Sequence, residues 1–206
     1  MMIFTGMDNS GKTTIVQKTA KKLGLPVVKS LGPAHPVDEK HIWLLDQMTR
    51  EKAFPGSVIF DRFLPFEEMV YGKVLRGDPI YSLDDPYMKS LKDLNPTIVY
   101  TRPHSSTIFN WDGREQMDGV IEQKEKLLAA WDDLMWGLMA RGWDVQVYDY
   151  EAENEGEQVS GLEEFAKFLN DLVKTTYPPH PKDGQPLQWK KHKPLENIDE
   201  DEEDED

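Results

Sequence analysis

Eight residues near the start of the chain have the types and the spacing of a phosphate-binding loop. Residues 6–13 read Gly-Met-Asp-Asn-Ser-Gly-Lys-Thr, which fits the pattern G-x-x-x-x-G-K-[ST]. Glycines let the backbone curl until several N–H groups point inward, and a helix that starts there adds the partial positive charge of its first turn. The pattern therefore predicts binding of a nucleoside triphosphate. The residues expected to hold its phosphates are Gly6, Asn9, Ser10, Gly11, Lys12, Thr13 and Thr14.

Two side chains of this loop have separate roles. Lys12 would reach the outer phosphates as a compact positive charge, and the Thr13 hydroxyl would bind Mg²⁺. The motif requires a strand before it and a helix after it. An apolar run at 3–5 and apolar residues at helical spacing between 15 and 23 meet that requirement. A glycine turn that matches by chance is the alternative, and this context makes it rarer.

Short apolar strands alternate with helical segments along the rest of the chain, which predicts a parallel sheet covered on both faces. The fold class is therefore α/β, a P-loop NTPase-type three-layer fold with a five-stranded parallel sheet flanked by helices. In the helix 38–52 we expect Ile42, Leu45 and Met48 to face inward. The strands are expected at 3–5, 27–30, 57–60, 97–100 and 144–150, and further helices at 65–76, 86–94, 120–139 and about 160–172.

Charged residues follow two of these strands. In an open parallel sheet, ligands bind beyond the carboxyl ends of the strands, so Asp61 and Arg62 should face the phosphate loop. Asp61 would then hold a magnesium-bound water, and Arg62 a phosphate. A surface ion pair at the strand end is the alternative. Arg102 follows the fourth strand in the same way, so it is also a candidate for holding a phosphate.

Two segments near this edge are candidates for closing the site. The helix 65–76 has two apolar faces, and only one can belong to the core, so Phe66 or Tyr71 could reach a second substrate. The polar segment 106–118 contains Arg114 and precedes the longest helix, which is typical of a lid that excludes water and delivers charge.

Composition limits the classes of protein that the chain can represent. The net charge is −14, and the last eight residues, 199–206, are all acidic. The remaining body is only mildly acidic, and nothing in the composition provides the basic face that nucleic-acid binding normally needs. There is no cysteine, and no run of 18 apolar residues that could span a membrane. We expect a soluble, cytoplasmic protein with a folded domain at 1–176 and a largely disordered tail at 177–206.

The motifs together resemble the thymidylate kinase family, over roughly residues 2–175. The resemblance rests on Gly-Met-Asp-Asn-Ser-Gly-Lys-Thr at 6–13 and Asp-Arg-Phe at 61–63, which look like that family's G-x-D-x-x-G-K-[ST] and D-R-[YH]. It implies phosphoryl transfer from Mg-ATP to a deoxynucleoside monophosphate, with dTMP or a modified-pyrimidine analogue expected. By resemblance, Asp8 contacts the acceptor sugar and Arg62 holds the acceptor phosphate. The family usually forms dimers, so a homodimer is implied as well.

The family divides by whether its charge-stabilising arginine lies in the phosphate loop or in the lid. Asn9 follows Asp8 here, so Arg114 is the candidate, and the chain is similar to the lid-arginine type. The physical reason is that negative charge spreads over the oxygens of the transferred phosphoryl group, where a delivered cation stabilises it. The expected catalytic residues are therefore Lys12, Arg114 and Asp61.

The acceptor's base is left open by a departure from the family. The family usually has Arg-Glu-Pro-Gly after its second strand, whereas this chain has Lys-Ser-Leu-Gly-Pro at 29–33. Some virus-encoded kinases of the superfamily look similar, so a phage origin is a further expectation. Two alternatives remain: a kinase that acts on a hydroxymethylated pyrimidine base within DNA, and a nucleotide-dependent switch without acceptor kinase activity.

Overall fold

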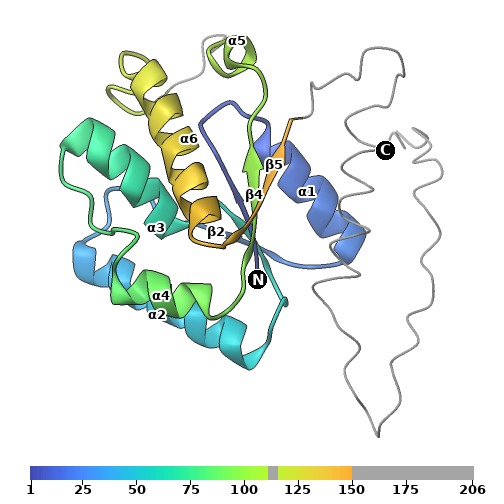
Figure 1. The fold of residues 1–206 in the computed structure, drawn as a ribbon. Helices are drawn as coiled ribbons and strands as arrows, with labels where there is room; N and C mark the ends of the chain where they lie inside the picture. The colour runs from blue at the N-terminus through green and yellow to red at the C-terminus, as the bar shows by residue number, and fades with distance from the viewer. Residues whose placement is uncertain (111–115, 150–206) are drawn as a thin grey trace, which may run out of the picture. The chain divides into compact units, whose positions relative to one another are not determined.

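Five parallel strands form the sheet, in the order β2-β3-β1-β4-β5 (Figure 1). Because every neighbouring pair is parallel, all carboxyl ends lie at one edge. The three central strands are buried throughout, whereas the edge strands β2 and β5 are partly exposed. The predicted fold class is confirmed. The strands are β1 (Met2–Thr5), β2 (Val27–Lys29), β3 (Ile59–Asp61), β4 (Thr97–Thr101) and β5 (Asp144–Tyr148).

The computed structural model describes residues 1–110 and 116–149. All of them lie within one unit, Met1–Ala152. The expected last helix, the acidic tail and the domain boundary near residue 176 lie outside the described residues. So does Arg114, together with the middle of the expected lid.

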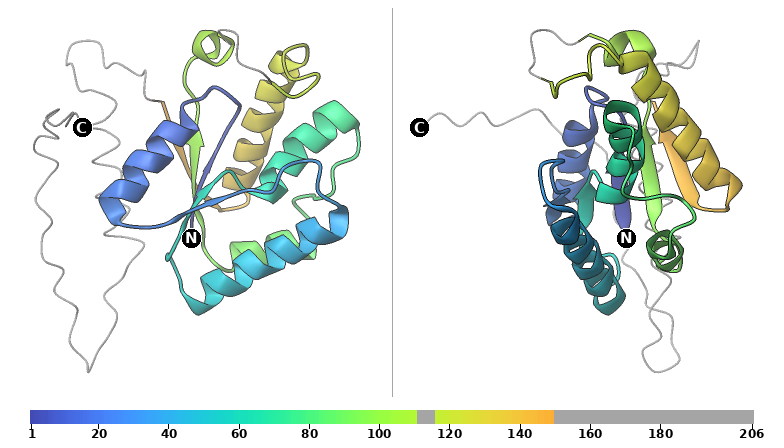
Figure 2. Two further views of the ribbon diagram at one scale, coloured as in Figure 1. Left: turned by 180° about the vertical axis from the view of Figure 1, so that it is seen from behind. Right: turned by 90° about the vertical axis from the view of Figure 1, so that its left-hand side faces the viewer.

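Helices cover both faces of the sheet, as right-handed crossovers between parallel strands require. Figure 1 shows α1 (Lys12–Leu23) on one side of the strands. The helices α2 (Val37–Ala53), α3 (Leu64–Glu67), α4 (Pro86–Lys92) and α6 (Lys124–Ala140) lie on the other side. Figure 2 shows the same separation from behind. The described residues contain no helix that is both long enough and apolar enough to cross a membrane.

The helix expected at 65–76 has two parts. Its first turn is α3, with Pro65 at a position where a missing N–H costs nothing, and it continues as the π-helix η1 (Glu68–Arg76). Gly77, at a φ of 73°, ends the helix as predicted. Five consecutive residues of η1, 68–72, are buried, and the helix packs against α6.

The predicted inward face of α2 is wrong for two of its three residues. Ile42 and Leu45 are 66% and 47% exposed, whereas Met48 is partly buried and packs against the core. The side chains that point inward include Lys40, Leu44 and Glu51. The apolar pattern gave the wrong face because the buried face of α2 contains charged residues, and each of them is paired. Lys40 pairs with Glu68 at 2.9 Å, and Glu51 pairs with the N-terminal ammonium.

Two helices near the expected lid also differ from the prediction. The long helix begins at Lys124 rather than at 120, because residues 118–123 form turns in which Gly119 has a φ of 81°. A short helix that the pattern did not predict, α5 (Ser105–Ile108), follows β4. The long helix α6 turns an apolar stripe toward the core. Its members are all buried: Leu127, Leu128, Trp131, Leu134, Met135 and Leu138.

The start of the phosphate loop is packed against the end of β4. Ser10 Oγ lies 2.7 Å from Thr101 Oγ1, which in turn donates to the carbonyl oxygen of Thr5 at 3.1 Å. A Cβ built on Gly6 would lie 2.6 Å from the carbonyl oxygen of Thr101, and Gly6 has a φ of 137°. No side chain fits at this position. Glycine is therefore required where the loop crosses β4.

Replacing Gly6 tests this packing. We expect Gly6→Ala to lower the free energy of unfolding by about 2–5 kcal/mol, through the unfavourable φ and the overlap with Thr101. Gly32→Ala is the matched control, since a Cβ there meets nothing within 4 Å, and it should change stability by less than about 0.5 kcal/mol. Urea denaturation of both variants measures the difference, and equal shifts would contradict the packing argument.

Candidate functional site

The loop between β1 and α1 curls back on itself, as a phosphate cradle must. Asn9 and Gly11 have φ angles of 63° and 76°, and α1 begins at Lys12 with Gly11 as its N-cap. The unpaired N–H groups of the first turn of α1 therefore open onto the loop. Thr13 and Thr14, the next residues of that turn, are exposed to solvent.

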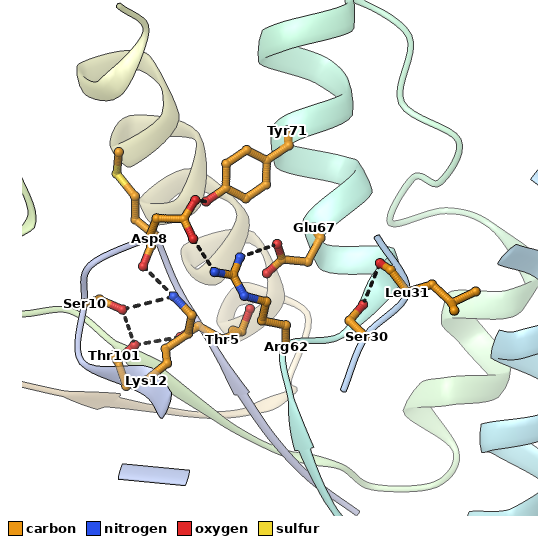
Figure 3. A network of polar contacts seen from close by, with 11 residues as sticks. Thr5, Asp8, Ser10, Lys12, Ser30, Leu31, Arg62, Glu67, Tyr71 and Thr101 are labelled. Carbon is orange, nitrogen blue, oxygen red and sulfur yellow. Dashed lines mark hydrogen bonds and ion pairs between the residues drawn. The ribbon is translucent and has the colours of Figure 1, made fainter. Parts of the chain in front are cut away.

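Lys12 lies inside the curl of the loop (Figure 3). The ammonium donates to the carbonyl oxygen of Met7 and to Ser10 Oγ at 3.3 Å, and the side chain is only 4% exposed. Burial lowers the pKa of Lys12 to about 8, and the positive charge of Arg62 adds to this effect. A bound anion would restore the preference for the charged form, so the loop is built to receive negative charge.

Arg62 reaches the same loop from the end of β3. It has a φ of 70°, and its backbone N–H donates to the carbonyl oxygen of Phe4 on β1 at 2.9 Å. Its guanidinium pairs with Asp8 of the loop and with Glu67 Oε2 of α3 at 3.0 Å. Tyr71 of η1 donates to the second oxygen of Asp8 at 3.0 Å. Figure 3 shows these four side chains in one connected network.

The network separates the pKa values of its two carboxyl groups. Burial alone would raise the pKa of Asp8, but the positive charges of Arg62 and Lys12 outweigh it, so that pKa is lowered. Burial raises the pKa of Glu67 despite its pairing with Arg62. The pKa of the Tyr71 hydroxyl rises too, through burial and the negative charges of Glu67 and Asp8. Asp8 is therefore firmly ionised, while Glu67 binds a proton more readily than an exposed glutamate.

Asp61 is the last residue of β3, beside Phe4 in the register of β1. It is 7% exposed, and its Oδ1 atom is buried without a hydrogen-bond partner in the described part of the chain. An unpaired buried carboxylate oxygen suits a metal-bound water, because Mg²⁺ usually keeps several of its waters. The described residues hold no cluster of three or more metal-binding side chains, so a cation here would depend on phosphate oxygens as well.

Two predicted site residues are placed elsewhere. Phe66 is fully buried, with its ring centroid 5.8 Å from that of Phe63 and 6.3 Å from that of Trp143, so it belongs to the core in this structure. Arg102 turns toward α6, where its guanidinium donates twice to Asp132, at 2.8 and 3.0 Å. Both positions follow from packing partners that the local sequence does not reveal.

Two contacts of the site were missed by the sequence analysis. Glu67 was not considered, although an acidic residue five positions after Arg62 at the start of a helix was a usable signal. Asn9 was assigned to the phosphates alone. Its amide also donates to the carbonyl oxygens of Thr107 and Asn110, at 2.9 and 2.6 Å, which ties the loop to the end of α5.

Solved structures of low sequence identity share this fold. The YorR protein from Bacillus subtilis, in complex with phosphorylated GDP, matches with a TM-score of 0.59 and 20% identity, over 84% of this chain and 96% of that one. Deoxyadenosine kinase from M. mycoides with bound dATP matches with a TM-score of 0.53 and 18% identity, over 82% and 98%. The same kinase with bound dCTP gives 0.51 and 20%, over 83% and 100%.

At these identities the likeness shows the fold. No family model matches the chain, and no curated protein matches its sequence. The chain therefore has the P-loop NTPase-like fold that these proteins share. In this chain the phosphate loop, Arg62 and the buried carboxylate of Asp61 all lie at the carboxyl ends of the strands.

Proposed function

We propose that this protein is a Mg-ATP-dependent kinase that phosphorylates a deoxynucleoside monophosphate, with dTMP or a modified-pyrimidine analogue as the acceptor. The observation that carries the proposal is the proximity of two cations from separate elements. Lys12 of the phosphate loop and Arg62 at the end of β3 lie close enough to act electrostatically on each other and on Asp8, with which Arg62 also forms an ion pair. If one phosphate-bearing ligand bound at each cation, the phosphate groups of the two ligands would lie next to each other.

The donor side would use the curled loop. Lys12 would exchange its contact with the carbonyl oxygen of Met7 for the outer phosphates of ATP, and the N–H groups at the start of α1 would hold the others. Thr13 and Asp61 are the residues proposed to hold Mg²⁺, Asp61 through a water at its unpaired Oδ1. Bound Mg²⁺ would neutralise charge on the phosphate oxygens.

The acceptor side would use the network around Arg62. The guanidinium would hold the acceptor phosphate, Asp8 the sugar, and Tyr71 would keep Asp8 in place through its hydrogen bond. These groups act by position and charge, so no covalent enzyme intermediate is needed. The proteins of similar fold support ligands of this kind, since their solved structures contain dATP, dCTP and phosphorylated GDP.

One observation favours a second candidate acceptor, the hydroxyl of a deoxynucleoside. Arg62 already contacts two carboxylates, Asp8 and Glu67, so a neutral acceptor would not need to displace either. Deoxyadenosine kinase, whose structure has a similar fold, is named for a nucleoside, and this supports the alternative.

A single assay separates the candidates. The protein is incubated with Mg-ATP and, in turn, with deoxynucleosides, their monophosphates and duplex DNA that contains hydroxymethylated pyrimidines. ADP release that depends on dTMP or an analogue supports the proposal. Release with nucleosides or with the DNA alone moves the acceptor to the corresponding alternative, and no acceptor-dependent release leaves the nucleotide-dependent switch.

The role of the loop lysine is tested by Lys12→Ala. We expect kcat/KM for ATP to fall about 10²–10³-fold, because a donor aimed at the transition-state charge is lost. Lys18→Ala on the exposed face of α1 is the matched control and should keep full activity. Steady-state kinetics at saturating acceptor measure both variants, and equal activities would remove Lys12 from the mechanism.

Arg114 lies outside the described residues, and its role as a transition-state cation stays a prediction from the sequence. We expect Arg114→Ala to lower kcat about 10³-fold or more, with little change in the KM of either substrate. Arg50→Ala, on the exposed face of α2, controls for the loss of one positive charge. Turnover of Arg114→Ala near that of the control, at saturating substrates, would show that the charge comes from elsewhere.

A further inference from the structure

Glu67 is a largely buried carboxyl group that the proposed reaction does not use. It is the last residue of α3, and its side chain is 14% exposed. One oxygen, Oε2, accepts a hydrogen bond from Arg62 at 3.0 Å. The other, Oε1, is buried and has no hydrogen-bond partner within the described residues. An ionised oxygen left without a donor is costly, so this atom favours a proton or a new donor.

The charges that face Glu67 come from three elements. Arg62 at the end of β3 pairs with it directly, and Lys12 and Asp8 of the phosphate loop act on it from further away. Tyr71 of η1 faces the same cluster through Asp8 and stays neutral, since its pKa is raised. Lys40 of α2 and Arg76 of η1 both pair with the neighbouring residue Glu68 instead.

Arg62 is already paired with negative charge before an acceptor arrives. Asp8 and Glu67 each contact Arg62, so its single positive charge already has two negative partners. The phosphate of a nucleoside monophosphate is mostly a dianion at pH 7, because its second pKa is about 6. Bound at Arg62, it would add negative charge next to both carboxylates. Asp8 is the firmly ionised one, and Glu67 is the one whose burial favours the neutral form.

We propose that Glu67 takes up one proton from solvent when a phosphate-bearing acceptor binds at Arg62, and that its carboxylic acid then donates a hydrogen bond to an acceptor phosphate oxygen. This inference rests on the proposed function and adds a specificity-determining residue to it. The proton binds at a carboxylate oxygen of Glu67, no bond to phosphorus forms or breaks there, and the local charge rises by one unit.

Proton uptake by Glu67 makes the acceptor affinity depend on pH in one defined direction. Above the pKa of Glu67 in the free protein, binding of the acceptor requires proton uptake, so the apparent acceptor affinity falls as pH rises. Below that pKa the proton is already present and the dependence disappears. In Glu67→Gln an amide permanently replaces the acid as a donor, so this variant should bind the acceptor without proton uptake.

The test is calorimetric titration of dTMP into the full-length protein at pH 7.0, in two buffers of different ionisation enthalpy. At this pH Lys12, whose pKa is about 8, is already mostly protonated and contributes little. We expect uptake approaching one proton per bound dTMP in the wild type and almost none in Glu67→Gln. Between pH 7 and 8 the wild-type affinity should fall up to about tenfold relative to that of Glu67→Gln. Glu125→Gln, at an exposed position of α6, should match the wild type.

Two outcomes would overturn the inference in distinguishable ways. If dTMP binds without proton uptake, or with equal uptake in Glu67→Gln, Glu67 does not carry the proton, and the proposed function stands. If dTMP does not bind while deoxythymidine is phosphorylated, both the inference and the monophosphate acceptor fail. The wild-type proton count decides the first case even where Glu67→Gln does not fold.

Discussion

The site depends on one guanidinium held between two carboxylates. Arg62 contacts the phosphate loop through Asp8 and the end of α3 through Glu67, while its own backbone N–H donates to β1. Two segments that are distant in the sequence, residues 4–8 and residues 62–67, are thereby held together around one charge. Removing the guanidinium would leave two half-buried or buried carboxylates without their partner, a loss that typically costs about 3–5 kcal/mol. The arrangement is therefore structural as well as functional.

The same principle recurs one residue further along the helix. Glu68 pairs with Lys40 of α2 and with Arg76 at the end of η1. Lys40 also donates to the carbonyl oxygen of Pro33, at 2.9 Å, in the loop that follows β2. The two adjacent glutamates thus contact different parts of the protein. Glu67 pairs with Arg62 beside the phosphate loop, and Glu68 pairs with Lys40, which contacts the loop after β2. That second loop contains residues 29–33, where the sequence differs from the thymidylate kinase pattern. The π-helix η1, which begins at Glu68, buries both Glu68 and Tyr71.

Local patterns predicted most of the regular structure. The five strands were found from apolar runs bounded by breakers, and their parallel arrangement from the alternation with helices. The strand order and the exact register depend on pairings between distant segments, which no local pattern encodes. The inner face of α2 was misjudged for a related reason. Lys40 and Glu51 are buried only because Glu68 and the N-terminal ammonium are there to pair with them.

The sequence by itself determined that a phosphate loop stands between the first strand and the first helix, and that Asp61 and Arg62 follow a neighbouring strand. Spacing of residue types is sufficient for that, because loop geometry and strand ends are local features. Tertiary structure alone decided which charges meet. It placed Arg62 between Asp8 and Glu67, turned Arg102 toward Asp132, and buried Phe66 in the core. Electrostatic pairing and burial are set by side chains that lie far apart along the chain, so only the folded protein determines them.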